Sequence, residues 1–358
     1  MRIKLPRLFV SPGLGLAPLA LCAALASGQT SAQAADCPGH PDAIGTSRTL
    51  VVDPADHRKI GTMSYSETLP LADHEVVLTF DDGPLAPYTN RVLDILDAEC
   101  VKATYFIVGV MAKSSPELVR RIAERGHTIG THSMSHPIRF RRLSADAGIA
   151  QFDNGIDATA AALGDQGKLA PFFRFPGFGN TAPVETYAAS KGVMIWGADM
   201  PADDWRKISA KEVAKRAIQR IEAKGKGVLL LHDIHERTVE ALPVILKELK
   251  ERGYRIVHVV PADAEHPATP TVASDWQMHS RPKPAQVAAL PKAGVSDVSG
   301  SGAGEAIQEK SADSLKPDKS RHHGRHYVVT ERHKQSHRRR TVDMWRGKYP
   351  AADRHASR

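Results

Sequence analysis

Short apolar runs alternate along most of the chain with longer segments whose apolar residues recur at helical spacing. The runs 76–80 and 228–231 are almost continuously apolar, as expected for strands buried on both faces of a sheet. The pattern predicts strands at 76–80, 103–108, 127–130, 171–174, 192–196, 228–231 and 255–260. It predicts helices near 89–99, 115–125, 144–163, 183–191, 211–223 and 238–252. This alternation indicates an α/β fold, a parallel (β/α) barrel with its chemistry at the C-terminal ends of the strands.

The same pattern divides the chain. Regular alternation is confined to one stretch, and a shorter arm with brief strands precedes it. After that stretch, prolines and small polar residues interrupt the chain and no apolar period persists, which is typical of a flexible linker. We therefore predict an N-terminal arm at 35–73, an α/β domain at 74–262, a flexible linker at 263–320 and a basic His- and Arg-rich tail at 321–358.

The first 34 residues have the pattern of a secretory signal peptide. Arg2, Lys4 and Arg7 precede the apolar stretch 14–26, and small residues around Ala34 suit cleavage after it. A membrane anchor is the alternative, but Pro and Gly shorten the continuous apolar run. We expect an exported protein, periplasmic or extracellular after cleavage.

Removal of the leader leaves two cysteines, Cys37 and Cys100. An exported chain meets an oxidising compartment, so this pair is expected to form a disulfide that ties the arm to the helix after the first strand of the domain. Two unpaired thiols are the alternative.

Composition adds a contrast between body and tail. With 42% hydrophobic residues, the 358-residue chain can bury a sizeable core. The formal net charge of +8 is accounted for by residues 311–358, which carry 13 Lys and Arg against 5 Asp and Glu. We expect this tail to contact an anionic surface of the cell envelope, or else to be solvated without a partner. Export argues against a specific nucleic-acid partner.

Two groups of polar residues stand out in the first half of the domain. Asp81 and Asp82 end an apolar strand and are followed by Gly-Pro, so both carboxylates can converge where the backbone bends. His132 and His136 are four residues apart, a spacing that suits two ligands of one metal ion. Two imidazoles and one carboxylate make a site that leaves a position open for water or substrate. The alternatives are an ordinary Asp-Asp turn and ordinary hydrogen-bonding histidines.

Further polar residues follow later strands. Arg174 ends one strand and could orient one of the aspartates. Asp199 follows another strand, and Trp205 lies close behind it, where its ring could line a sugar-binding groove or cap the core. His232 ends the apolar strand 228–231 and could act as a general acid or close the core through hydrogen bonds.

Taken in order, these motifs resemble those of the polysaccharide deacetylases with a NodB-homology domain, known as carbohydrate esterase family 4. The resemblance covers roughly residues 74–262 and is carried by Thr79-Phe80-Asp81-Asp82-Gly83-Pro84, His132-x-x-x-His136, Arg174-Phe175-Pro176, Asp199…Asp204-Trp205 and Leu230-Leu231-His232. It implies a distorted parallel (β/α) barrel of the NodB-homology type, here with an N-terminal arm and a disordered basic C-terminal tail.

The resemblance also implies roles for the residues that match. Asp81 would be the catalytic base, tethered by Arg174. His232 would be the general acid, oriented by Asp199. Leu230 would shape the pocket for the acetyl methyl group. The implied ligands of a divalent metal, with zinc expected first and cobalt or nickel as alternatives, are Asp82, His132 and His136.

The sequence departs from the family pattern at two points. An aromatic residue usually follows the proline after the motif arginine, and its backbone N–H stabilises an oxyanion. Here Gly177 precedes Phe178, so either residue could supply the donor. The Asp-x-x-Asp-Trp motif is longer here, so either Asp203 or Asp204 could fill its second position. Both changes could alter the groove and the substrate.

The resemblance implies a metal-dependent hydrolase that removes N-acetyl groups from an amino-sugar polymer, such as peptidoglycan or a chitin-like glycan, and releases acetate. Two alternatives remain open. The same residues would cleave the O-acetyl esters of a xylan-type substrate. A non-catalytic barrel that binds glycan is the other, although the base, the acid and all three metal ligands are present.

Overall fold

The computed structural model describes residues 37–278. The predicted leader, the tail at 321–358 and the linker beyond residue 278 lie outside this part of the chain. The strands are β1 (Thr46–Val52), β2 (Lys59–Ile60), β3 (Glu75–Asp81), β4 (Thr104–Ile107), β5 (Thr128–Thr131), β6 (Leu169–Phe173), β7 (Met194–Trp196), β8 (Met200–Pro201), β9 (Gly227–His232) and β10 (Arg255–Pro261). The α-helices are α1 (Tyr88–Ala98), α2 (Gly109–Ser114), α3 (Pro116–Glu124), α4 (Ala145–Leu163), α5 (Ala182–Ser190), α6 (Ala210–Lys224) and α7 (Glu236–Glu251).

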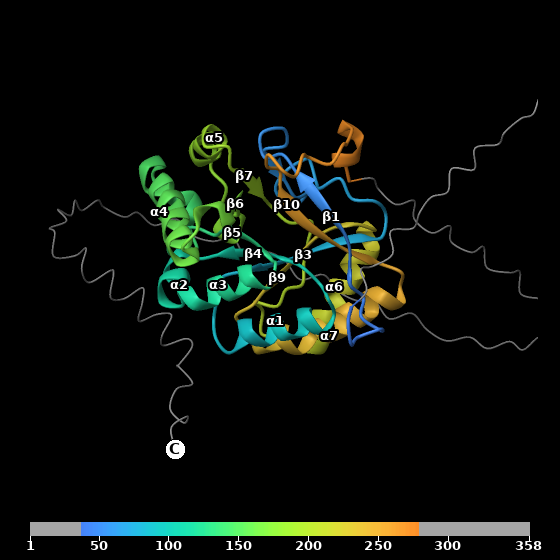
Figure 1. Ribbon diagram of the computed structural model, residues 1–358. Coiled ribbons are helices and arrows are strands. Elements are labelled where there is room, and N and C mark those ends of the chain that lie inside the picture. Colours follow the sequence, from blue (N-terminus) through green and yellow to red (C-terminus); the bar gives the residue numbers. More distant parts are fainter. Residues whose placement is uncertain (1–36, 279–358) are drawn as a thin grey trace, which may run out of the picture.

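All ladders between these strands are parallel. The main path is β1-β10-β3-β4-β5-β6-β7-β2, while β9 pairs with β3 and β8 pairs with β9 (Figure 1). Only three residues separate β7 from β8, so one stretch of chain pairs with β6 at its start and with β9 at its end. The sheet thus bends back towards β3, which confirms the α/β prediction and places the ends of β3 and β9 side by side.

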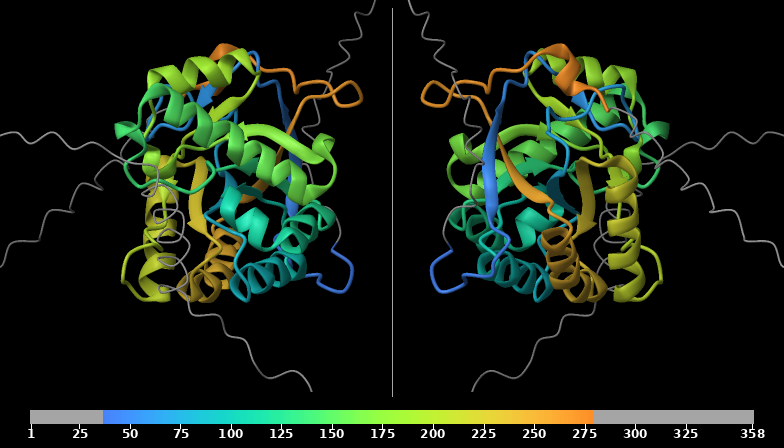
Figure 2. Two further views of the ribbon diagram at one scale, coloured as in Figure 1. Left: turned by 90° about the vertical axis from the view of Figure 1, so that its left-hand side faces the viewer. Right: turned by 90° about the vertical axis from the view of Figure 1, so that its right-hand side faces the viewer.

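The central strand β3 is buried along its whole length because helices cover one face and other strands cover the opposite face. Leu78 and Phe80 pack with residues of α1, α6 and α7, which lie together along one side of the sheet (Figures 1 and 2). Val77 points the other way and packs with Val228 and Trp196. This two-sided burial explains why the strand reads as an unbroken apolar run.

Helix boundaries follow local capping signals. The Ser209 side chain accepts a hydrogen bond from the Glu212 N–H at the start of α6, and Gly225 ends that helix in the left-handed conformation. Ser144 and Gly164 do the same for α4. These caps set the two ends of α6, which lies between β8 and β9 in the sequence. The next strand after α6 is β9, which carries His232.

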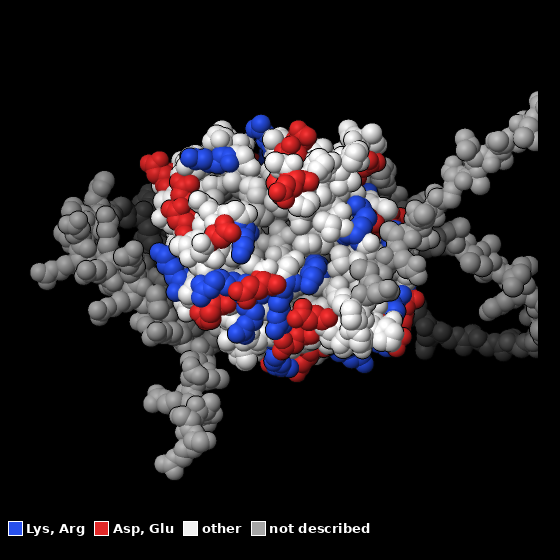
Figure 3. Space-filling view, viewed as in Figure 1, with Lys and Arg blue, Asp and Glu red and all other residues white. Residues whose placement is uncertain are grey.

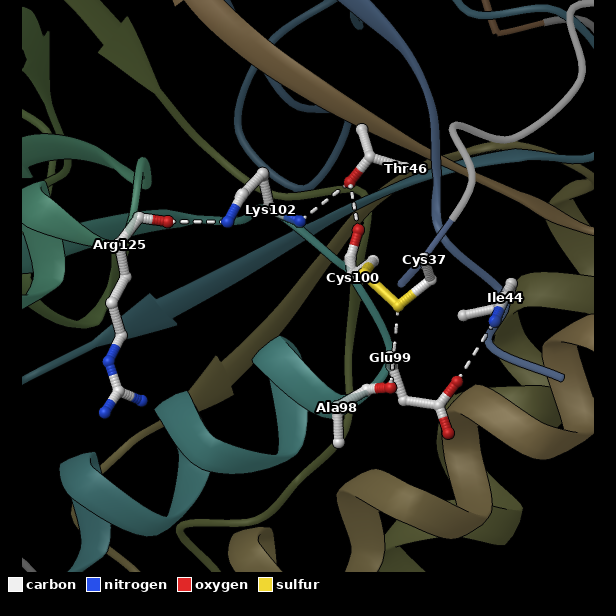
Figure 4. The surroundings of a disulfide bond; sticks show 8 residues. All are labelled: Cys37, Ile44, Thr46, Ala98, Glu99, Cys100, Lys102 and Arg125. Atoms are coloured by element: carbon white, nitrogen blue, oxygen red, sulfur yellow. Dashed lines mark hydrogen bonds between the residues drawn. A yellow bond between two sulfur atoms is a disulfide. The ribbon is translucent and has the colours of Figure 1, made fainter. Parts of the chain in front are cut away.

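The N-terminal arm belongs to the same sheet, because β1 pairs with β10 and β2 pairs with β7. Cys37 and Cys100 form the expected disulfide, which joins the arm to the end of α1 (Figure 4). The nearby Ile44 N–H donates to the Glu99 carboxylate at 3.0 Å. The start of the chain is therefore fixed against the helical layer.

Within the segment predicted to be a linker, residues 269–277 contact the arm. Trp276 is 3% exposed and its ring stacks on that of His57, with 3.4 Å between the centroids. The Thr68 N–H donates to the Trp276 carbonyl, and Glu67 pairs with Gln277 in an antiparallel bridge. The prolines of this segment favoured a linker, and no feature of the sequence pattern indicated that the Trp276 side chain would be buried.

On the face of the molecule drawn in Figure 3, acidic and basic side chains are intermingled rather than separated by sign. Within residues 37–278, no helix combines the length and apolar character that a membrane span requires.

Candidate active site

The backbone turns sharply where β3 ends, and this turn carries both aspartates. Successive side chains of a strand point to opposite faces. Asp82 breaks the alternation because its φ is 76°, in the left-handed region. As a result both carboxylates approach one imidazole nitrogen: His132 Nε2 lies 3.7 Å from Asp81 Oδ2 and 3.5 Å from Asp82 Oδ1.

The residue after the aspartates must be glycine because a buried carboxylate lies against it. A Cβ at Gly83 would stand 2.2 Å from Asp233 Oδ1. Asp233 Oδ2 accepts a hydrogen bond from Thr89 Oγ1 at 2.6 Å, and burial raises the pKa of Asp233 to about 7. Sequence reasoning missed Asp233, although its place beside His232 at a strand end is a signal of the same kind.

Three side chains at this edge could hold a metal ion. Ligand atoms of Asp82, His132 and His136 lie within 4.8 Å of one another. Asp82 Oδ1 is buried without a hydrogen-bond partner and lies 3.2 Å from His136 Nε2. His132 Nδ1 donates to the Arg174 carbonyl at 2.7 Å, which leaves Nε2 free of a proton in the neutral ring. An unpartnered carboxylate oxygen and a correctly oriented imidazole fit a divalent metal.

The charges of the cluster suit the same role. Burial opposes ionisation of Asp82, yet His136 and His232 hold the pKa of its carboxyl group below the usual value. Burial lowers the pKa of His132 to about 4. An ionised carboxylate and a neutral imidazole are the forms that bind metals.

Arg174 fixes the other aspartate. Its Nη1 donates to Asp81 Oδ1 at 2.7 Å and to Thr79 Oγ1 at 2.8 Å. Its Nη2 donates to the Gly197 carbonyl at 2.8 Å, and its guanidinium lies over the Phe106 ring. The arginine is fully buried and directs one oxygen of Asp81 away from the metal cluster, so Oδ2 is the oxygen that faces the cluster.

His232 lies next to Asp81 in the β3–β9 ladder and pairs with Asp204. Its Nδ1 is 2.8 Å from Asp204 Oδ1, and its backbone N–H donates to Asp204 Oδ2 at 2.7 Å. Thr238 Oγ1 donates to the same Oδ2. Burial alone would lower the pKa of His232, but the Asp204 carboxylate outweighs it and raises the pKa to about 10. His232 therefore holds a proton at neutral pH.

Two side chains adjoin this histidine. The Trp205 ring meets the His232 ring edge to face at 5.6 Å between centroids and is 43% exposed. Leu230 lies two residues before His232 and therefore on the same face of β9, where it is buried. An exposed aromatic ring and a buried aliphatic side chain thus border the proton-bearing imidazole.

Comparison with known proteins gives the chain a family. Residues 69–196 match the family model described as "Polysaccharide deacetylase". A peptidoglycan-N-acetylglucosamine deacetylase of Bacillus cereus is 34% identical over 185 residues, which is 49% of this chain and 66% of that protein, slightly less than two thirds of its length. A second protein of that name and organism is 31% identical over 196 residues, or 53% of this chain and 89% of its own. This chain belongs to the polysaccharide deacetylase family.

A solved structure agrees with that membership. The peptidoglycan deacetylase of Bdellovibrio bacteriovorus aligns with a TM-score of 0.54 and 32% identity, over 61% of this chain and 60% of that one. The polysaccharide deacetylase fold expected from the order of the motifs is thus confirmed.

One assignment within the deacetylase motifs was wrong. Asp199 was expected to orient His232, but Asp204 does so. Asp199 Oδ1 accepts from the backbone N–H and the hydroxyl of Thr62, and Oδ2 accepts from Thr68 Oγ1 and the Val228 N–H. The motif spacing did not reveal which carboxylate faces the histidine.

The stretched motif also resolves the choice between Asp203 and Asp204. Asp203 Oδ2 accepts from Arg216 at 2.7 Å and Arg220 at 2.8 Å, on the side of α6. Asp203 has a φ of 61°, and this kink allows the two adjacent carboxylates to point to different elements. Asp204 therefore fills the second position of the motif.

The other departure concerns the backbone donor after Arg174. The Phe178 N–H already donates to the Phe175 carbonyl at 3.1 Å. The Gly177 N–H has no hydrogen-bond partner within residues 37–278, and Gly177 has a φ of 54°. Of the two candidates named from the sequence, Gly177 is thus the one with an available donor, and Phe178 contributes a half-buried ring beside it.

Proposed function

We propose that this protein is a metal-dependent deacetylase that hydrolyses the N-acetyl groups of peptidoglycan or a chitin-like amino-sugar polymer and releases acetate. One observation carries the proposal. A three-ligand metal cluster, a tethered carboxylate and a protonated histidine converge at the ends of β3, β5 and β9. The names of the relatives support an N-acetylated glycan as substrate.

The first chemical task is to deliver water to the acetamide carbon. A divalent metal bound by Asp82, His132 and His136, with zinc proposed and cobalt or nickel as alternatives, would act as a Lewis acid and lower the pKa of water. Asp81 Oδ2 accepts a proton from the attacking water. Arg174 holds Oδ1, so the proton goes to the oxygen that faces the cluster.

The second task is to stabilise the tetrahedral intermediate and expel the amine. The Gly177 N–H, which follows the arginine strand, would donate to the developing oxyanion, a contact worth roughly 3 kcal/mol. His232 then donates its proton to the departing nitrogen. The C–N bond breaks, acetate leaves, and the sugar keeps a free amine. Asp204 stabilises the protonated imidazole that this step requires.

We also propose that the mature protein acts outside the cytoplasm. The predicted leader supports this, and the Cys37–Cys100 disulfide is consistent with an oxidising compartment. The predicted basic tail would assist by contacting an anionic envelope surface. Removal of residues 311–358 should then lower retention on envelope fractions at low salt, and unchanged retention would dismiss this role.

The proposal is tested by measuring acetate release from peptidoglycan and from chitooligosaccharide with the mature chain. Release should stop after chelation and return when zinc or cobalt is added. An Asp81→Asn variant should bind metal but release no acetate. An O-acetylated xylan serves as the comparison substrate, because the same residues would hydrolyse an ester. Acetate from the ester alone would favour the esterase alternative, and bound metal without release from any substrate would refute the enzyme.

A further inference from the structure

A short basic loop follows the second histidine of the metal cluster. Residues 138–142 read Ile-Arg-Phe-Arg-Arg, and we name Arg139, Arg141 and Arg142 the arginine rim. Phe140 between them is completely buried and packs edge to face against Phe175, with 5.2 Å between the ring centroids. This buried ring anchors the loop, so the flanking arginines are held at the surface.

The arginine rim lies beside the loop that carries the proposed oxyanion donor. Arg141 Nη2 is 3.4 Å from the Phe178 carbonyl oxygen and 3.4 Å from Asn180 Oδ1. A Cβ at Gly179 would lie 3.2 Å from the Phe140 Cβ and 3.3 Å from the Arg141 nitrogen. Arg139 follows His136 by three residues, so their Cα atoms are at most about 11 Å apart. The rim therefore borders the active site.

The charge of the rim is not neutralised within the described chain. Arg139 and Arg142 are exposed and form no ion pair with any residue of 37–278. Two basic residues elsewhere are paired instead: half-buried Arg125 pairs with Asp94, and exposed Arg252 pairs with Glu222. Two unpaired guanidinium groups on an anchored loop beside the site offer ready donors to an anion.

We propose that the arginine rim binds carboxylates of the glycan strand and so favours an acidic substrate over a neutral one. The inference rests on the proposed deacetylase function, since the strand must pass the site for its neighbouring units to reach the rim. Guanidinium groups bind carboxylates through paired, charge-assisted hydrogen bonds. In peptidoglycan such carboxylates come from the lactyl ether of one sugar or from attached peptides, whereas chitin has none.

The test compares Arg139→Gln/Arg142→Gln with Arg125→Gln/Arg252→Gln in the full mature chain. The control removes the same charge at the C-terminal ends of α3 and α7, away from the strand ends that carry the site. Arg141 is kept because its guanidinium contacts the Phe178 carbonyl and Asn180. The predicted basic tail is common to all forms, so a difference between the two variants reports on the rim.

Two readouts are needed, kcat/KM for acetate release and direct binding to soluble glycan strands. On acidic strands the rim variant should lose about three- to tenfold in both, and the loss should disappear near 1 M salt, where the screening length is about 3 Å. Chitooligosaccharide, and acidic strands whose carboxylates are converted to neutral amides, should show no difference. Strands with and without their peptides distinguish the two carboxylate sources.

The inference is overturned if the rim variant and the control behave alike, or if the rim variant loses as much on amidated strands as on acidic ones. Failure of the proposed function looks different. In that case no protein releases acetate, while salt-sensitive binding of acidic strands still falls in the rim variant alone, and the rim assignment stands without the enzyme.

Discussion

At the scale of single residues, Arg174 shows a buried charge in which every guanidinium nitrogen donates a hydrogen bond. Its guanidinium donates to Thr79, Asp81 and two backbone carbonyls, and none of it is exposed. A buried ion pair of this kind is costly to break because the partner would be left uncompensated. Here it fixes which oxygen of Asp81 can accept a proton.

The His232–Asp204 pair makes a separate prediction. Asp204→Asn keeps the side-chain shape but removes the charge that raises the pKa of His232. Turnover should fall about 100-fold or more, because the histidine is no longer held in its protonated form. The alkaline limb of the pH–rate profile should move to lower pH, since His232 then loses its proton sooner. Metal content should be unchanged. An alkaline limb that stays in place would contradict the assignment.

Asp199 should behave differently when it is replaced. Its carboxylate is 1% exposed and accepts hydrogen bonds from Thr62, Thr68 and Val228. Asp199→Ala leaves these buried donors unpaired and should lower the free energy of unfolding by about 3 kcal/mol. Urea denaturation measures the loss. The folded fraction should keep the alkaline limb of the wild-type pH–rate profile. A shift of that limb would show that Asp199, like Asp204, influences the protonation of His232.

These two aspartates mark how far sequence reasoning reaches at this scale. Asp81, Asp82 and the two metal-cluster histidines could be predicted because their spacing is tied to strand ends. The direction of a side chain in an irregular loop could not, since it depends on backbone angles such as the φ of 61° at Asp203. The free donor at Gly177 was likewise hidden until its neighbours' hydrogen bonds were known.

At the scale of elements, the longer parallel strands and most helices followed from apolar patterning, whereas the short strands β2 and β8 did not. β2 and β8 are two residues long, too short to show a period. The prolines in segment 263–278 predicted a linker, and only the burial of the Trp276 ring in the structure reveals that the segment contacts the arm. Long-range packing of a single side chain leaves no repeat in the sequence.

Trp276 should therefore contribute strongly to stability. Trp276→Ala removes a ring that is stacked on His57 and whose Nε1 donates to Thr271 Oγ1. We expect the free energy of unfolding to fall by about 3–5 kcal/mol. Val272→Ala is the control on the same segment, because Val272 is 62% exposed and should change stability by less than about 0.5 kcal/mol. Equal effects of the two substitutions would show that the segment does not support the fold.

At the scale of the whole molecule, the two ends of the described chain are fixed to one body. The disulfide joins Cys37 to a residue 63 positions later, and β1 pairs with β10 from the other end of the domain. Contacts that connect distant parts of the sequence favour a single cooperative unfolding transition. The free energy of unfolding at each pH then characterises the described chain as a whole.

Two buried histidines away from the metal cluster should make that stability sensitive to acid. Burial, with the charge of Lys102 as a further cause, lowers the pKa of His127 to about 3 and that of His258 to about 4. The His127 Nδ1 accepts the Ala103 N–H and cannot do so when protonated. Between pH 6.5 and about 4 the unfolded chain therefore binds protons that the folded chain excludes. The contribution of these two histidines to stability should fall as pH falls through this interval.

The size of the effect can be isolated with His258→Gln. Each histidine that stays neutral in the fold contributes a slope of about 1.4 kcal/mol per pH unit in this interval. The variant lacks one titrating group, while its amide can still donate to Thr128 Oγ1, as the His258 Nε2–H does. Urea denaturation at several pH values gives the free energy of unfolding of the wild type and of the variant. As the pH is lowered from 6.5, the wild-type value should fall faster than the variant value by that slope, so the two plots against pH converge. Ionised carboxylates such as Glu75, whose pKa is lowered by Arg48 against the effect of burial, begin to lose their contribution only below about pH 4.5. Parallel curves for the variant and the wild type would show that His258 takes up its proton without unfolding, and the acid sensitivity would then belong to other groups.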